Sequence, residues 1–281
     1  MSQPPPPPYE QRPNQPPLPE GPPPTAPPPL PPLPPATPSS SKVLKSCSHH
    51  LSTEERLKRR KTCRFIEEAG RILQLPRVAT ATGMVLFHRF FSKHSFDEHD
   101  RFEVAVACIL LAAKTEESPK KLSHVILKCH QLKTRATDPG KGMLDPKGEE
   151  YLKLKERILL LERIILHTIG FELSIDHPYK FLVDQIKSLT GKRKVKYVDS
   201  KKDQSKMVNE LLQMSMNFAN DSMHSNLCLQ FSAKFIAHAC VFMSACYCKI
   251  TLVNASPPLT WESALEVPVE SLVSISEQIL E

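Results

Sequence analysis

The chain has 281 residues, eight cysteines without paired spacing and a modest formal net charge of +7, so it is long enough for one or two domains and shows no disulfide framework. It contains neither an apolar run of eighteen residues nor a charged and then apolar N-terminal segment, which argues against a membrane span and a secretory signal. We therefore expect a soluble intracellular protein with no membrane contact, and the lack of a dominant basic stripe argues against nucleic acid as a partner.

Proline dominates the N-terminal region. Most of the 28 prolines fall in the run from Pro4 to Pro38, which can bury almost no apolar surface. We therefore predict that residues 1–50 form a disordered tail, which either binds a proline-recognition module or serves as a spacer. Cys47, His49 and His50 lie close together, but no second pair with zinc-ligand spacing follows, so we predict neither a metal site nor a cofactor.

Three helices are predicted in the region after the tail. Ser52 to Glu55 has the spacing of a capping box, which predicts a helix from Thr53 to about Leu73. A second, apolar-rich helix should cover about Val78 to Phe91, and a third should begin at Asp100. Because Val104–Ala113 is apolar on every face of this third helix, it must be surrounded by other helices.

Two more helices complete a first unit, predicted over residues 51–173. Ser118–Pro119 has the pattern of a helix cap followed by proline at the first helical position, which predicts a fourth helix to about Leu132. A fifth helix should run from Glu149 to Ile169 and end at Gly170, which tolerates the left-handed conformation. No hairpin signal separates alternating segments, so no β-sheet is predicted.

The rest of the chain, residues 174–281, is predicted to repeat this plan. A helix should begin near His177, followed by a basic loop and a helix from about Lys206 to Ser222. The run Ala239–Ala245 then reads like Ala107–Ala113 at an offset of 132 residues, although short apolar runs also match by chance. We therefore predict an all-α fold of two five-helix units, each built around a buried central helix.

Two charged side chains fall on otherwise apolar helix faces. The residues three and four positions from Glu162 are all isoleucine or leucine, and a carboxylate placed there needs a partner. Lys114 closes an apolar helix just before Glu116 and Glu117. Lys114 could pair with Glu117 at the helix end, and Glu162 could form an internal salt bridge. Alternatively, Lys114 and Glu162 lie side by side on adjacent helices and offer an ammonium and a carboxylate to a partner's backbone.

Four segments resemble the cyclin family, and within it the transcriptional T and K classes. They are Met84–Phe91, Leu111–Leu122, Leu161–Leu166 and Gly170–Tyr179. The resemblance implies tandem cyclin boxes, of which the first, residues 51–173, docks a cyclin-dependent kinase. It also implies a set of kinase-binding residues. This set consists of Lys114, Glu116, Glu117, Glu162, Leu166 and Phe171.

By this resemblance the chain is a nuclear regulatory subunit that activates a serine/threonine kinase acting on the RNA polymerase II C-terminal domain. It is not expected to be an enzyme, because the sequence has no glycine-rich phosphate loop, nucleophile elbow or catalytic-loop signature. A cell-cycle cyclin, or a B-type general transcription factor that binds DNA with the same fold, are the alternatives. The first helix reads Arg60–Phe65 where cell-cycle cyclins carry a Met-Arg-Ala-Ile-Leu patch, so that mode of substrate recruitment is not expected.

Two short basic clusters could serve as nuclear localisation or nucleic-acid patches. They are Lys58–Lys61 and Lys192–Lys194. The simpler interpretation is that the first cluster is a solvated helix face and the second a solvated loop.

Overall fold

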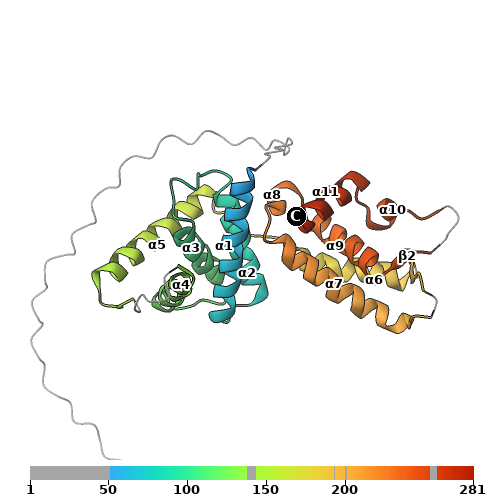
Figure 1. The fold of residues 1–281 in the computed structure, drawn as a ribbon, viewed down its shortest axis with the longest axis horizontal. Helices are drawn as coiled ribbons and strands as arrows, with labels where there is room; N and C mark the ends of the chain where they lie inside the picture. Colours follow the sequence, from blue (N-terminus) through green and yellow to red (C-terminus); the bar gives the residue numbers. More distant parts are fainter. Residues whose placement is uncertain (1–50, 138–143, 193, 200, 254–257) are drawn as a thin grey trace, which may run out of the picture. The chain divides into compact units, whose positions relative to one another are not determined.

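The structure is a computed structural model that describes residues 51–137, 144–192, 194–199, 201–253 and 258–281. Ser46–Glu281 forms one compact unit. The predicted tail and its three candidate metal ligands lie outside the described residues, so a partner for that tail stays a prediction. The described part is predominantly helical (Figure 1), and none of its helices is long and apolar enough to cross a membrane.

Five helices make up the first half of the folded region. The third of them, α3, packs against the other four, which surround it (Figure 1). Every residue of its Val104–Ala113 segment is buried, so the predicted central helix is confirmed. The helices are α1 (Thr53–Ile72), α2 (Arg77–Phe90), α3 (Arg101–Thr115), α4 (Leu122–Thr137) and α5 (Glu149–Thr168).

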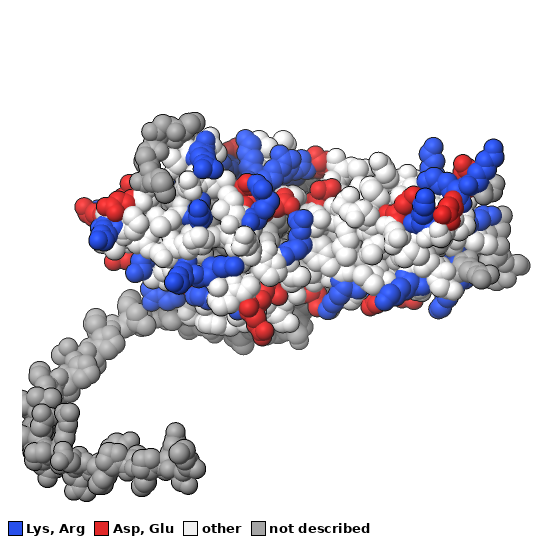
Figure 2. All heavy atoms as spheres, turned by 90° about the horizontal axis from the view of Figure 1, so that it is seen from below, with Lys and Arg blue, Asp and Glu red and all other residues white. Residues whose placement is uncertain are grey.

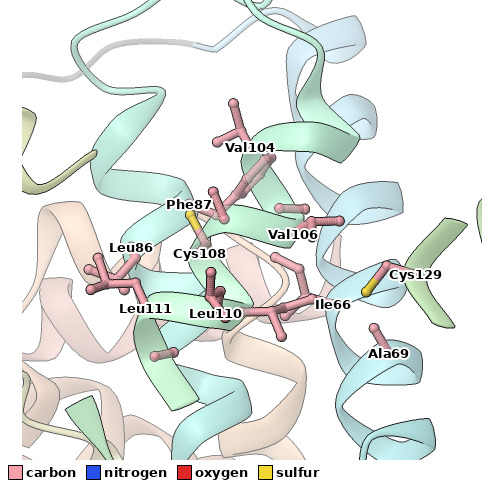
Figure 3. Close-up of a cluster of buried hydrophobic side chains, with 14 of the residues drawn as sticks. Ile66, Ala69, Leu86, Phe87, Val104, Val106, Cys108, Leu110, Leu111 and Cys129 are labelled. Carbon is pink, nitrogen blue, oxygen red and sulfur yellow. The ribbon is translucent and has the colours of Figure 1, made fainter. Parts of the chain in front are cut away.

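The core around α3 consists of interlocking aliphatic, aromatic and thiol side chains from the surrounding helices. Complete burial of such side chains contributes roughly 1.5–3 kcal/mol each to folding. Figure 3 shows α3 residues Val104, Val106, Cys108, Leu110 and Leu111 beside Ile66 and Ala69 of α1, Leu86 and Phe87 of α2 and Cys129 of α4.

Capping side chains fix two helix starts, and of these two caps the sequence predicted the one at Ser52. Ser52 Oγ accepts a hydrogen bond from Glu55 N at 3.1 Å, and the carboxylate of Asp100 accepts from the amides of Phe102 and Glu103. Each cap satisfies amides that have no partner within their own helix. The capping box is not completed, because the Glu55 carboxylate does not bond the backbone N–H of Ser52. It accepts hydrogen bonds from the Arg59 guanidinium, one turn later in the same helix.

The predicted start of α4 at Ser118–Pro119 is wrong, because that segment ends α3 instead. Ser118 N donates to Ala113 O at 2.9 Å and Glu117 N donates to Lys114 O at 3.3 Å. Glu117 has a φ of 50°, in the left-handed region. These are the bonds of a Schellman motif, which satisfies the last carbonyls of a helix. The chain then continues without helical structure until α4 begins at Leu122.

The second half of the folded region also surrounds one buried helix. Its central helix, α9, packs against α6, α7 and α11. Two short helices of four and five residues bring the helices among its described residues to six, one more than predicted. The helices are α6 (Pro178–Gly191), α7 (Met207–Ser222), α8 (Leu227–Gln230), α9 (Ala233–Tyr247), α10 (Trp261–Leu265) and α11 (Val269–Leu280). A single 3₁₀ turn, Gln204–Lys206, precedes α7.

The two central helices match in more than composition. Helices α3 and α9 are both 15 residues long, and their first and last residues are offset by 132. The same offset relates their capping residues Asp100 and Ser232, and the left-handed residues Glu117 and Lys249 that follow them. Agreement of caps, lengths and terminal turns supports a duplication, where the apolar match alone left the question open.

A small β-sheet contradicts the expectation that no sheet forms. Strand β1 (Val195–Tyr197) pairs antiparallel with β2 (Ile250–Leu252), with Val195 opposite Leu252 and Tyr197 opposite Ile250. Val195 and Tyr197 are buried while the residue between them is exposed. No hairpin signal marks this pairing, because each strand has only three residues and a long stretch of sequence, including α7 and α9, separates them.

Candidate functional site

Lys114 and Glu162 form an ion pair between the last turn of α3 and the middle of α5. The distance from Lys114 Nζ to Glu162 Oε1 is 2.6 Å. The lysine side chain is 51% exposed and the glutamate side chain 11% exposed, so solvent reaches the pair from the lysine side. Lys114 therefore pairs across the two helices, and the alternative pairing with Glu117 does not occur.

Buried neighbours on α5 hold the carboxylate in this position. Ile158 and Ile165 are almost completely buried in the core around α3, and both lie within four positions of Glu162. Residues three or four apart share one face of a helix. Packing of that face against α3 brings Glu162 to the border of the core, where its ammonium partner satisfies its charge.

The two acidic residues after Lys114 have different environments. Glu116 is half-buried, and its Oε1 accepts a hydrogen bond from Thr82 Oγ1 of α2 at 2.6 Å. Glu117 is exposed and occupies the left-handed position of the turn that ends α3. Only Glu117 is therefore presented openly to solvent beside Lys114.

Two buried residues, Thr82 and His177, continue the hydrogen-bond network from Glu116 into the interior, and the sequence analysis missed both. Thr82 Oγ1 lies 2.7 Å from His177 Nε2. Because the threonine hydroxyl donates its proton to Glu116, it must accept from the imidazole N–H. The pKa of His177 is lowered by burial, which favours the neutral ring, and the nearby Glu116 carboxylate partly opposes this effect. The ring's Nδ1 is buried and has no hydrogen-bond partner among the described residues.

The apolar part of the candidate site lies along and just beyond α5. Leu166 is half-buried, and its carbonyl accepts from Phe171 N at 2.9 Å. Gly170 and Phe171 both have positive φ, of 64° and 60°, so the predicted left-handed helix end at Gly170 is confirmed. The Phe171 side chain is 60% exposed.

Leu159 and Leu160 are two further exposed apolar side chains of α5, and neither was predicted as a site residue. Their exposures are 37% and 48%. They belong to a run of four apolar residues in which only Ile158 and Leu161 are buried. Such a run does not show by itself which of its members face the core, so the sequence carried no clear signal for these two.

The basic cluster Lys58–Lys61 is not a uniformly solvated face, contrary to the simpler interpretation. Arg59 is only 2% exposed, and its guanidinium donates to Phe91 O and to the Glu55 carboxylate, both at 2.7 Å. Lys58 pairs with Glu54. On the face seen in Figure 2, basic and acidic side chains are interspersed over the described residues and form no continuous basic stripe.

Sequence comparisons relate most of the folded region to one family. The family described as "Cyclin, N-terminal domain" matches residues 37–174. The chain is 35% identical over 223 residues to Cyclin-T1-5 of Arabidopsis thaliana, a match covering 79% of this chain and 36% of that protein. It is 36% identical over 235 residues to human Cyclin-K, covering 82% of this chain and 37% of that protein. The chain thus spans little more than a third of these relatives.

Comparison with solved structures relates the fold to the same family. A chain of the yeast RNA Pol II CTD kinase CTDK-1 complex matches with a TM-score of 0.60 and 16% identity, covering 81% of this chain and 65% of that one. A viral cyclin from Herpesvirus saimiri matches with a TM-score of 0.52 and 11% identity, covering 80% and 86%. At these identities the matches establish the shared fold.

Proposed function

Because this chain belongs to the cyclin family, we propose that it is the regulatory subunit of a cyclin-dependent serine/threonine kinase. We further propose that the kinase phosphorylates the RNA polymerase II C-terminal domain, and that the complex acts in the nucleus. The T and K names of the sequence relatives, and the fold shared with a subunit of a yeast CTD kinase complex, support this choice over a cell-cycle role. The chain itself would perform no chemistry.

The ion pair of Lys114 and Glu162 is the observation that carries the proposal. The Lys114 ammonium and the Glu162 carboxylate lie 2.6 Å apart at the border of the core, and the pair is open to solvent on the lysine side. On docking, the ammonium can bond a partner's carbonyl group and the carboxylate a partner's amide group. Charge-assisted hydrogen bonds are stronger than neutral ones and fix a docking register. A partly exposed ion pair contributes only about 0–1 kcal/mol to folding, so its loss should affect binding far more than stability.

The exposed apolar surface beside the ion pair would supply much of the binding energy. Phe171 and Leu159 are 60% and 37% exposed in the free chain. Covering one such side chain completely is worth roughly 1.5–3 kcal/mol, so partial burial of both yields a few kcal/mol. The charged pair sets orientation and the apolar side chains set affinity, a common division in protein interfaces.

Activation would follow the mechanism that the family resemblance implies. Docking pushes the kinase's regulatory helix inward, so that its glutamate pairs with the lysine that holds the ATP phosphates. The activation loop is released at the same time. In energetic terms the chain binds the active conformation of the kinase more tightly than the inactive one, and thereby shifts the population toward it.

Co-purification from nuclear extract tests the proposal. The full chain should retain a kinase active on polymerase C-terminal repeat peptide, and the Lys114→Ala, Glu162→Ala double variant should retain at least tenfold less. Glu103→Ala with Arg157→Ala is the matched control, because it removes another exposed ion pair between α3 and α5, with a shortest distance of 2.9 Å, and should keep the kinase. Equal recovery with both double variants would reject the docking surface, and a kinase inactive on the repeat peptide would reject the transcriptional role.

A further inference from the structure

We propose that the loop between α2 and α3 binds a zinc ion through His94, Glu98 and His99. One potential ligand atom from each of these side chains lies within 4.8 Å of the other two. No part of the proposed kinase-docking function requires this cluster, and the sequence pattern alone did not identify it. The structure brings the three groups together because the loop folds back on the end of α2.

A buried phenylalanine fixes the positions of both imidazoles. The His94 ring is stacked on Phe90, with ring centroids 4.4 Å apart and an interplanar angle of 20°. The His99 ring meets the same phenylalanine edge to face at 5.1 Å, and the two histidine rings are 5.3 Å apart. Phe90 is completely buried. Both imidazoles are therefore held against one rigid platform, which reduces the entropy lost when a metal orders them.

A threonine on α5 determines which nitrogen of His94 is available. Thr168 Oγ1 donates to Ile164 O at 2.8 Å, so at His94 Nε2, 2.9 Å away, it can only accept. Nε2 must therefore carry the proton, which leaves the Nδ1 lone pair free for a metal. Metal-binding histidines commonly have their second nitrogen oriented by such a hydrogen bond.

The third ligand is prepared by the turn of the loop itself. Ser95 N donates to Glu98 Oε2 at 3.2 Å, and Asp97 N donates to Ser95 Oγ at 3.1 Å. These bonds close the loop into a compact turn that carries Glu98 toward the two histidines. One carboxylate oxygen is engaged by the turn, and the other is left to coordinate a cation.

Two imidazoles and a carboxylate favour zinc over the hard cations. Magnesium and calcium prefer ligand sets made of oxygen, whereas tetrahedral zinc takes nitrogen and oxygen at about 2.0–2.2 Å. A tetrahedral site needs its ligand atoms to approach to about 3.3 Å of one another, given these bond lengths. Glu98 is exposed and His99 half-buried, so rotation of their side chains can close the present separation.

A zinc ion here would order a loop that already contacts the end of α5. The loop already contacts that end through Lys93 Nζ, which donates to Thr168 O at 2.6 Å, and through the His94 contact with the same residue. Three protein ligands leave a fourth position for water or for a group from a partner. The site would therefore order the part of the loop that contacts Thr168, which lies three residues before Phe171 at the border of the proposed docking surface.

Metal titration of the full chain tests this site. All measurements use a Cys47→Ser, His49→Gln, His50→Gln background, so that these potential ligands cannot contribute. After treatment with EDTA and dialysis, calorimetric titration with zinc should give one equivalent bound, and cobalt should give the visible absorption of a tetrahedral nitrogen and oxygen site. Glu98→Gln and His99→Gln should each weaken zinc binding at least tenfold, and Thr168→Val about tenfold through the loss of ligand orientation.

His124→Gln provides the matched control, because His124 is exposed on α4 and outside the cluster. It should bind zinc as tightly as the background protein. Circular dichroism establishes that each variant is folded, and the exposed Glu98 is the substitution least able to disturb the core. Absence of zinc binding in the background protein, or unchanged affinity in both Glu98→Gln and His99→Gln, would overturn the proposal.

Discussion

Thr82 Oγ1 lies 2.7 Å from His177 Nε2, so a side chain of α2 is bonded directly to the residue before α6. Thr82 is completely buried and donates its own proton to Glu116, two residues beyond Lys114. One hydroxyl thus ties the turn that ends α3 to the connection between the two helical units. This pair of hydrogen bonds holds the turn that carries Glu116, next to Lys114 of the candidate docking site, in place.

Thr82→Val should destabilise the chain by about 1–3 kcal/mol, because it leaves a buried imidazole N–H and a half-buried carboxylate without their partner. The shape of the side chain hardly changes, so the loss is almost entirely polar. Urea unfolding followed by circular dichroism measures the effect as a lower midpoint at unchanged slope.

Thr80→Val is the matched control for Thr82→Val on the same helix. Thr80 is also buried, but its hydroxyl bonds only Pro76 O within the first turn of α2, at 3.3 Å. We expect its replacement to change the unfolding free energy by less than half as much. Equal effects of the two substitutions would show that the bond between Thr82 and His177 has no special role.

Gly70→Ala should also be destabilising, for a steric reason. A Cβ atom at this position would lie 2.4 Å from Thr80 Oγ1, where α1 passes α2. Overpacking of this kind costs about 1–3 kcal/mol, which outweighs the gain of about 1 kcal/mol from removing a helical glycine. Gly83→Ala, whose nearest neighbour would be at 3.6 Å, should be tolerated.

A double-mutant cycle identifies the clash. In a Thr80→Ala background the closest atoms are removed, and the cost of Gly70→Ala should fall to near zero in urea unfolding. The coupling energy should then be about 1–3 kcal/mol, as expected for residues in contact. Additive effects would place the destabilisation elsewhere.

The central helices could be predicted from sequence because their burial leaves a pattern that does not depend on neighbours. A helix that is apolar on every face, such as α3, has only one stable environment. Glu162 was informative for a related reason, because a carboxylate among isoleucines and leucines requires a partner. The residue types therefore indicated both the core and the charged pair.

Features that depend on competition between local signals, or on distant segments, could not be predicted. Ser118–Pro119 has the pattern of a helix start, but Ser118 also fits the end of α3. The hydrogen bonds from the Glu117 and Ser118 amides to carbonyls of the last turn of α3 favour the second role. The strand at Val195 finds its partner far along the chain, at Leu252. Thr82 is a single hydroxyl in an apolar helix, and only the folded chain places Glu116 and an imidazole on its two sides.

Phe171→Gly should separate kinase binding from folding. Phe171 has a φ of 60°, where a residue with a Cβ atom costs roughly 1–2 kcal/mol relative to glycine, and its side chain is 60% exposed. We therefore expect an unfolding free energy that is unchanged or up to about 1 kcal/mol higher, since relief of strain offsets the lost contacts. Kinase affinity, measured by calorimetry or surface plasmon resonance, should fall at least tenfold.

Gln74→Gly is the control for the effect of strain. Gln74 has a φ of 51° after the end of α1 and is not one of the proposed docking residues. Its replacement should raise stability in the same way without changing kinase affinity. A Phe171→Gly variant that binds the kinase normally would remove this aromatic side chain from the docking surface.

Acid should destabilise the chain through His88. Burial, helped by the charge of Arg59, lowers the pKa of His88 to about 3, and its Nε2 lies 3.1 Å from Met223 O. Between about pH 6.5 and 3 the unfolded chain therefore binds a proton that the folded chain excludes, so stability is complete above pH 6.5 and falls below it. From pH 7.5 to pH 5 the loss from this group should be about 2 kcal/mol.

His88→Gln should flatten this dependence, because the amide can still donate to Met223 O but does not titrate. Urea midpoints of the variant and the wild type should therefore converge as the pH falls from 7.5 to 5, a window that stays above the ordinary range of carboxylate titration. His124→Gln, at an exposed position, should keep the wild-type slope. If His88→Gln and the wild type lose stability in parallel, His88 is protonated without unfolding, and the contact between Arg59 and the imidazole does not hold it neutral.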